Sequence, residues 1–180
     1  ASGAKNIIGF DKDGLVCDHK SGDDAVRSWF VDNCSPGDFR GDIHEALNGA
    51  DIFIGVSAPN ILNEKDVAAM AKNSIVFALA NPDPEIDPTI ARKYSAVVAT
   101  GRSDQPNQIN NVLAFPGIFR GLLDGRITKI SDKMLIAAAN AIASCVTDQQ
   151  LNANFIVPSV FDSNVVSKVA DAVKSLCKSA

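Results

Sequence analysis

Short apolar runs that end in polar residues alternate along this chain with segments of helical periodicity. Short runs of β-branched and small apolar residues are typical of parallel strands that are buried on both faces. They predict strands over residues 6–10, 51–56, 74–80 and 96–100. Apolar positions spaced as on one face of a helix predict helices over residues 23–33, 42–48, 63–72, 87–94, 115–123, 133–146 and 164–177.

This alternation of strands and helices predicts the fold class. Strands that alternate with helices form βαβ units, and such units build a parallel sheet with right-handed crossovers. We therefore expect an α/β, Rossmann-like doubly wound fold with a mostly parallel sheet and helices on both faces. The four strands should lie side by side, with their carboxyl ends at one edge. No linker or repeat is visible, so residues 1–180 are predicted to form a single domain.

Only half of the sequence signature of a dinucleotide-binding fold is present. Such a fold opens with a strand, a Gly-x-Gly-x-x-Gly turn and a helix, but this chain contains no Gly-x-Gly. Asp11 does stand at the tip of the first predicted strand, where these folds place an acid on the ribose, ~20 residues after the glycines. The predicted fold therefore lacks its first strand–Gly-loop–helix unit. Alternatively, Asp11 merely begins a turn that Gly14 completes.

Polar residues gather where the later strands end, and ligands bind at the carboxyl ends of strands in open α/β sheets. Asn81 follows one strand, a turn from Gly101 follows the next, and the pair Asn110 and Asn111 comes shortly after. These positions predict an enzyme site. Each also has a structural alternative: an Asx turn with the next proline for Asn81, and a satisfied loop pair for the two later asparagines.

Two other positions at the strand ends have structural interpretations. Gly55 and Ser57 end a strand and are a plausible wall for an adenosine, although tight packing would also explain a glycine there. Arg102 and Asp104 are expected to form a charge pair that locks a turn, without a part in catalysis.

Charge and composition exclude several classes of partner. The formal net charge is −4 and no run of Lys or Arg occurs, so we expect no nucleic-acid partner. No apolar run is long enough for a membrane span, and no export signal is visible. We therefore expect a cytoplasmic protein that does not associate with a membrane. The cysteines lack metal-binding spacing and are expected to be free thiols; they are Cys17, Cys34, Cys145 and Cys177. We predict no metal site in this chain.

Three motifs carry a resemblance to a known family. They are FIGVSAPNIL, IVFALANPDPEI and VVATGRSDQPNQINNVLAFPGIFRG. In this order and spacing they resemble the C-terminal NAD-binding domain of malic enzymes, particularly the shorter bacterial-type enzymes, and the likeness runs from NIIGFDKDGL to IVPSVFD. The resemblance implies oxidation of L-malate with NAD or NADP and decarboxylation to pyruvate and CO₂, with Mg²⁺ or Mn²⁺.

The resemblance also implies roles for the asparagines. Asn81 and Asn111 resemble the asparagines that hydrogen-bond malate, and Asn110 is a close second in its pair. Asn81 would also touch the nicotinamide ribose. Uncharged amide donors suit such a site, because they orient carboxylates without holding the ground state as strongly as buried cations would.

The resemblance further implies which residues bind the cofactor. Asp11 resembles the acid that faces the adenosine ribose, and Gly101 the turn near the nicotinamide. Gly55, Val56 and Ser57 match the strand-end wall of the cofactor pocket. An acid on the ribose hydroxyls repels a 2′-phosphate, so NAD is predicted over NADP, although NADP remains possible because basic residues lie nearby in sequence.

The family's catalytic tyrosine and lysine, its metal ligands and its glycine fingerprint belong to a region that precedes these motifs. We therefore expect no catalytic residue and no metal ligand in this chain, and no activity from the chain alone. The expected partners are L-malate or pyruvate, the missing N-terminal part of the enzyme, and further copies in a homo-oligomer. Two alternatives stay open: a malolactic enzyme, which retains the cofactor and releases lactate, and a nucleotide-binding module without catalysis.

Overall fold

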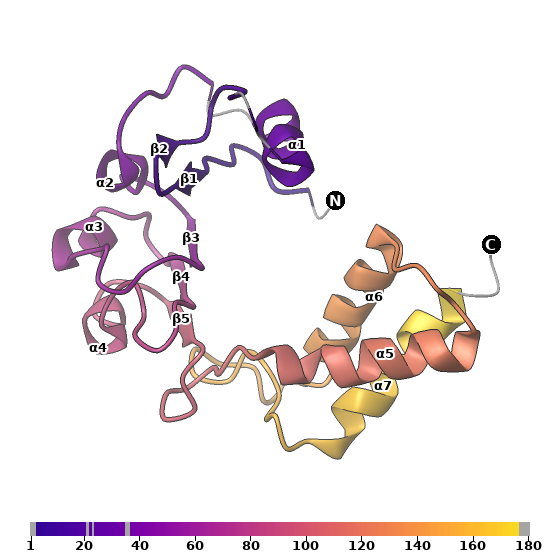
Figure 1. Cartoon of the computed structure of the whole chain (residues 1–180). Coiled ribbons are helices and arrows are strands. Elements are labelled where there is room, and N and C mark those ends of the chain that lie inside the picture. Colours follow the sequence, from indigo (N-terminus) through magenta and orange to yellow (C-terminus); the bar gives the residue numbers. More distant parts are fainter. Residues whose placement is uncertain (1–2, 21, 23, 35–36, 177–180) are drawn as a thin grey trace.

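The computed structural model describes residues 3–20, 22, 24–34 and 37–176 (Figure 1). The strands are β1 (Phe10–Asp11), β2 (Gly14–Leu15), β3 (Ile52–Gly55), β4 (Ile75–Ala78) and β5 (Val97–Thr100). The helices are α1 (Ala25–Asn33), α2 (Ile43–Ala46), α3 (Glu64–Ala68), α4 (Pro88–Ala91), α5 (Phe115–Gly125), α6 (Asp132–Ala143) and α7 (Ser163–Ser175), with a 3₁₀ turn η1 (Asn111–Leu113) before α5.

The central sheet has three parallel strands in the order β3-β4-β5. Phe53 pairs with Val76, and Val76 with Val98, so these buried residues share one face. That face forms a hydrophobic core with Val67 of α3, Ala91 of α4, Leu47 just after α2, and Ile86 between β4 and α4. Three of the four predicted strands and the α/β class are thereby confirmed.

The prediction for residues 6–10 is wrong in its pairing. Only Phe10 of this run is in a strand, and β1 pairs antiparallel with β2 in a hairpin, apart from the three-stranded sheet. The hairpin forms because Asp11 accepts a hydrogen bond from the N–H of Asp13 at 2.8 Å and Gly14 adopts φ +108°. In the usual doubly wound strand order, 3-2-1-4-5-6, the first strand lies between the second and the fourth. If the run at residues 6–10 takes the place of the second strand and β3 that of the fourth, the two would not be neighbours.

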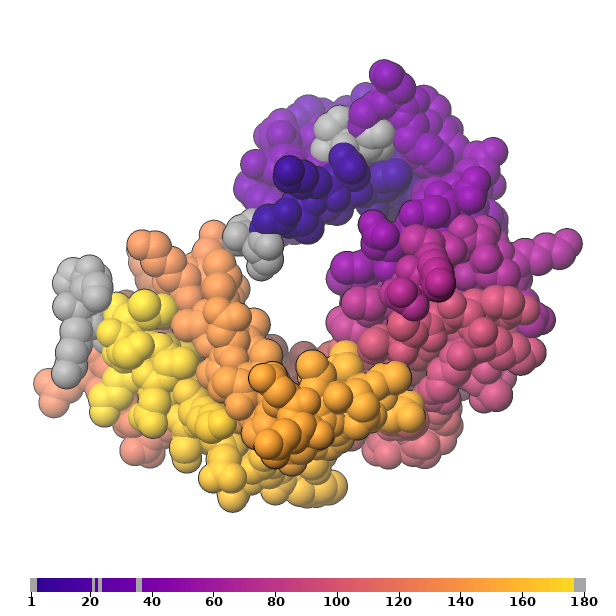
Figure 2. Space-filling model, turned by 180° about the vertical axis from the view of Figure 1, so that it is seen from behind, coloured from indigo at the N-terminus to yellow at the C-terminus, as the bar shows by residue number. Residues whose placement is uncertain are grey.

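The other face of the sheet is open along β3. Ile52 and Ile54 point to this face and are 55% and 62% exposed, and the outer edge of β3 pairs with no strand of the described chain. Figure 2 shows an open space between the N-terminal residues, the sheet region and the region of α6. Helices therefore cover one face of β3 here, and the sheet stops at an unpaired edge.

A second hydrophobic core lies among α5, α6 and α7, which form a separate group in Figure 1. α5 approaches α7 closely through two glycines. A Cβ on Gly117 would lie 2.5 Å from the Cβ of Val169, and a Cβ on Gly121 would lie 2.6 Å from the carbonyl oxygen of Ala170. Only glycine fits these two places on α5.

Asn107 joins this helical group to the sheet. Its Nδ2 donates to the carbonyl oxygens of Val98 at 3.0 Å and Ala153 at 2.8 Å, and its Oδ1 accepts the N–H of Ile156 at 2.9 Å. The residue is buried and adopts φ +57°, a left-handed conformation that asparagine tolerates better than most residues. One side chain thus fastens β5 to the segment that leads into α7.

The predicted helices all exist, with shorter or shifted ends. α3 ends at Ala68, before Asn73 turns left-handed at φ +64°, although the prediction ran to residue 72. α5 continues to Gly125 and stops where Arg126 is left-handed. The predicted cap at Asn63 and the proline at the start of α4 are confirmed. The predicted helix ends at residues 23 and 177 lie outside the described residues.

Candidate functional site

The carboxyl ends of β4 and β5 bring several predicted site residues close together. Gly101 follows β5, and a Cβ placed on it would lie 3.9 Å from the carbonyl oxygens of both Leu79 and Ile109. The N–H of Ile109 donates to the carbonyl oxygen of Thr100 at 2.8 Å. Asn81 and Asn110 follow Leu79 and Ile109 closely in the chain, so the three segments converge at one edge.

Gly101 itself has room for a side chain. A distance of 3.9 Å is ordinary van der Waals contact, and the backbone of Gly101 is not left-handed. The packing of the described residues therefore does not require glycine at this position. A glycine at such a strand end leaves space for a ligand to approach the backbone.

Gly55 differs, because the chain itself fills the space beside it. A Cβ on Gly55 would lie 2.5 Å from the carboxyl carbon of Glu85. Tight packing, the alternative left open by the sequence, therefore accounts for this glycine. Val56 and Ser57 follow it and are exposed at the strand end, where a wall of a cofactor site is predicted.

Glu85 is the residue at this edge to which the sequence analysis gives no role. Its side chain is fully buried, and its Oε1 accepts the N–H of Ser57 at 2.9 Å and the hydroxyl of Ser57 at 3.3 Å. Its Oε2 accepts the N–H of Ala80 at 3.0 Å. The carboxylate therefore joins the tips of β3 and β4. The sequence signal that could have indicated this role is the position of Glu85 in the strand-end motif, directly between Pro84 and the apolar Ile86, which is buried.

The asparagines fall into two groups. Within the described chain, the side-chain amides of Asn81 and Asn111 make no hydrogen bond, and both residues are exposed. The Asx turn considered for Asn81 is thus not formed. Asn110 instead caps η1, with its Oδ1 accepting the N–H of Val112 at 3.0 Å. Two amides remain available for a ligand, and the third has a structural task.

Arg102 and Asp104 form the predicted charge pair, with two nitrogen–oxygen distances of 2.8 Å. The hydrogen bond from Arg102 lowers the pKa of Asp104 below its ordinary value. Asp83 lies 3.7 Å from the same guanidinium. Arg102 and Asp83 line an open cavity of about 310 Å³ together with Asn60, Pro84, Asp87, Pro88 and Gln105. The pair locks the turn after β5, as expected.

Asp11 lies outside this edge, in the β1–β2 hairpin. Its Oδ1 accepts the N–H of Asp13, and its Oδ2 pairs with the guanidinium of Arg27 at 2.5 Å. The turn that the sequence offered as an alternative is therefore present. Its role on the ribose stays a prediction, and a ribose would have to share this carboxylate with Arg27.

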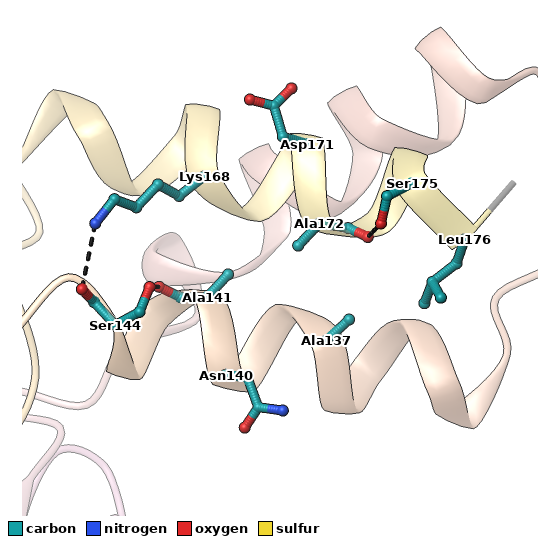
Figure 3. A pocket seen from close by; sticks show the side chains of 9 residues that line it. All are labelled: Ala137, Asn140, Ala141, Ser144, Lys168, Asp171, Ala172, Ser175 and Leu176. Atoms are coloured by element: carbon teal, nitrogen blue, oxygen red, sulfur yellow. Dashed lines mark hydrogen bonds between the residues drawn. The ribbon is translucent and has the colours of Figure 1, made fainter.

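A cavity of about 530 Å³ lies between α6 and α7 (Figure 3). Lys168 spans one end of it, where its Nζ donates to the carbonyl oxygen of Ser144 at 3.2 Å. Its other lining residues are mainly small: Ala137, Ala141, Ala172 and Ser175 among them. This cavity is a groove between helices, away from the strand ends, and offers none of the predicted chemistry.

Other observations bound the chemistry of the site. In the described part of the chain, no group of three or more His, Cys, Asp or Glu residues could hold a metal ion. Cys17, Cys34 and Cys145 are free thiols, and Cys177 lies outside the described residues. No described helix has the length and apolarity to cross a membrane.

Comparisons with known proteins agree with the motifs. The family model for "Malic enzyme, NAD binding domain" matches residues 1–178. The NAD-dependent malic enzyme of Geobacillus stearothermophilus is 51% identical over 173 residues, which are 96% of this chain and 36% of that protein. A bifunctional malic/malolactic enzyme of Bacillus subtilis is 45% identical over 95% of this chain and 42% of that protein.

A solved structure shows the same fold. The NAD-dependent malic enzyme of Thermotoga maritima superimposes with a TM-score of 0.84 and 42% identity, over 94% of this chain and 45% of that one. Relatives named NAD-dependent and NADP-dependent both occur. The chain spans less than half the length of each of these three malic enzyme relatives, from Geobacillus stearothermophilus, Bacillus subtilis and Thermotoga maritima. Its motifs, its fold and the matched family model agree, so the chain belongs to the malic enzyme family and corresponds to its NAD-binding domain.

Proposed function

We propose that this chain is part of a longer enzyme that oxidises L-malate with NAD and decarboxylates the product to pyruvate and CO₂. In this proposal the chain supplies residues that bind the cofactor and malate. The observation that carries it is the pair of uncommitted amides, Asn81 and Asn111, on two segments that converge with Gly101 at the carboxyl edge of a parallel sheet. Ligands of doubly wound folds bind at this edge.

The chain's own residues would bind and orient the reactants. The bound nicotinamide supplies the chemistry of hydride transfer, and alignment is the protein's share. The amide of Asn111 would donate to a malate carboxylate, and the amide of Asn81 would contact malate and the nicotinamide ribose. Ser57 and Val56 would form a wall beside the adenosine. These roles use donors that the described chain leaves without partners or exposed.

The described residues do not fit a divalent metal, because no cluster of suitable ligands is found among them. The proposal assigns the ligands of Mg²⁺ or Mn²⁺ and the groups that transfer protons to the remainder of the longer enzyme. That remainder would be substantial, since the relatives extend well beyond the matched region.

The proposed cofactor is NAD, with Asp11 on the ribose hydroxyls. Arg27 beside Asp11 complicates this choice, because a guanidinium close to the ribose is what accommodates a 2′-phosphate. NADP is therefore the second candidate. A malolactic reaction is the second candidate for chemistry, favoured by the 45% identity to the bifunctional relative.

Product analysis of the complete protein tests the proposal. Incubation with L-malate, NAD and Mn²⁺ should yield pyruvate, CO₂ and NADH in equal amounts. Lactate without net NADH would identify the malolactic reaction. Binding of NAD without consumption of malate would support a nucleotide-binding module and contradict the proposed enzyme.

A further inference from the structure

Glu85 connects the two strand ends to which the cofactor and substrate roles are assigned. The connection after β3 and the connection after β4 are already paired by backbone hydrogen bonds, from Asn60 N–H to the carbonyl oxygen of Pro84 and from Leu62 N–H to that of Glu85. The side chain of Glu85 then turns back to the strand tips and accepts three further hydrogen bonds from Ser57 and Ala80.

This arrangement has a cost that an ordinary loop would avoid. A carboxylate that leaves water is unfavourable unless hydrogen bonds replace those to the solvent. Glu85 is fully buried, and among the described residues it forms no salt bridge with a Lys or Arg. Its partners are two backbone N–H groups and one hydroxyl, all at the strand tips, and Gly55 has no side chain where the carboxylate lies.

We propose that Glu85 is a positioning residue that holds the tips of β3 and β4 at the spacing required to bind the nicotinamide cofactor. The inference rests on the proposed function. Ser57, which Glu85 holds by two hydrogen bonds, belongs to the predicted cofactor wall. Ala80, held by the third, immediately precedes Asn81. Glu85 thereby sets the positions of Ser57 and Asn81 without touching the cofactor or malate.

Glutamine is the informative replacement. It has almost the same shape, but only one of its two terminal atoms accepts a hydrogen bond, and the other is an N–H donor. Whichever way the amide turns, its NH₂ group faces the N–H of either Ser57 or Ala80. Glu85→Gln therefore disturbs one strand tip and leaves the surrounding core intact.

Asp66→Asn is a matched control. The carboxylate of Asp66 is also buried, and it accepts the N–H of Asn63 at 2.7 Å and pairs with His44 Nδ1 at 2.9 Å. These partners lie in α2 and at the start of α3, not at the strand tips. The control variant thus loses a buried carboxylate in the same core, without the proposed effect on the site.

The experiment measures the dissociation constant of NAD by titration calorimetry on the complete protein, with the melting temperature recorded for each variant. Glu85→Gln should raise this dissociation constant about tenfold, the effect of one lost buried hydrogen bond. Asp66→Asn should leave it within about twofold, even where its melting temperature falls equally. If Glu85→Gln does not fold, Glu85→Asp withdraws the same carboxylate from the strand tips by one methylene and should give the same rise.

Two results would overturn the positioning role. The first is an unchanged NAD dissociation constant in the Glu85 variant, and the second is an equal rise in both variants, which would indicate general loosening of the core. In either case the wild-type protein still binds NAD, so the proposed function stands. If the wild-type protein binds neither NAD nor NADP, the proposed function fails and the positioning role fails with it.

Discussion

At the scale of single residues, the two neighbouring asparagines of the site differ in their structural roles. Asn111 has an exposed amide without a partner in the described chain, and Asn110 caps η1. Asn111→Ala in the complete enzyme should lower kcat/KM for malate about ten- to a hundredfold, because one charge-assisted hydrogen bond contributes roughly 1.5–3 kcal/mol. The KM for NAD and the melting temperature should change little. Steady-state kinetics with each substrate varied in turn measures this.

Asn110→Ala is the natural comparison for that variant. Loss of its cap should lower the melting temperature, since capping side chains contribute about 1 kcal/mol. An unchanged response to malate in Asn111→Ala would remove Asn111 from the site. A loss of malate turnover confined to Asn110→Ala would exchange the roles of the two residues.

Cofactor choice is also decided at the scale of one residue. The wild-type enzyme should show higher kcat/KM with NAD than with NADP. Asp11→Ala removes the acceptor for the ribose and the negative charge that repels a 2′-phosphate, so the ratio should shift toward NADP by about tenfold. The kinetics of both cofactors give this ratio directly.

Asp51→Ala is the control, because Asp51 is an exposed acid that precedes β3, at the opposite end of that strand from the predicted cofactor wall. Its cofactor ratio should stay that of the wild type. A wild-type preference for NADP, or a ratio that Asp11→Ala leaves unchanged, would mean that Asp11 does not face the ribose.

Among the elements, the pair α5 and α7 depends on the absence of side chains at two positions. Gly121→Ala should lower the melting temperature even though alanine favours helices by about 1 kcal/mol over glycine. The added methyl group would lie 2.6 Å from the carbonyl oxygen of Ala170 and 2.8 Å from Val173. Leu123→Ala on the exposed side of α5 should have little effect on a thermal melt. A Gly121→Ala protein that is more stable than the wild type would show that α7 can shift to make room for the added methyl group.

The link between sheet and helices gives a second prediction at this scale. Asn107→Ala leaves the carbonyl oxygens of Val98 and Ala153 and the N–H of Ile156 without their partner. The bond to Val98 is buried, and an unsatisfied buried group costs roughly 1–3 kcal/mol, so chemical denaturation should show a clear loss of stability. Asn140→Ala on the exposed side of α6 is the control and should behave as the wild type. Equal stability of the two variants would contradict the role of Asn107.

The extent to which sequence predicts this protein also depends on the element. β3, β4 and β5 are predictable because their apolar runs and polar ends are local signals. The pairing of residues 6–10 is not, since it depends on the Asp11–Gly14 turn and on which strand lies next to β3. Glu85 and Asn107 escape prediction because Ser57 is distant in sequence from Glu85, and Ala153 and Ile156 are distant from Asn107. A buried polar residue also leaves no periodic pattern.

At the scale of the whole molecule, residues 1–180 alone should not turn over malate. The described chain has no metal cluster, and the sequence offers no acid/base pair in the site. Electrostatic stabilisation and proton transfer each contribute about 10²-fold or more, so their joint loss leaves no measurable rate. A spectrophotometric assay with malate, NAD and Mn²⁺, beside the complete enzyme, tests this. Sustained NADH production by residues 1–180 would show that catalytic groups lie within them.

The unpaired edge of β3 has a consequence for how such a protein is made. An exposed edge with apolar side chains is a template for pairing with another chain, and natural proteins cover it. Ile52, Ile54 and Val56 stand at this edge. In the longer enzyme proposed above, a preceding segment would leave the ribosome before β3 and could cover this edge as soon as β3 emerges. Produced without such a segment, nascent chains would meet edge to edge, and aggregation would compete with folding from the start.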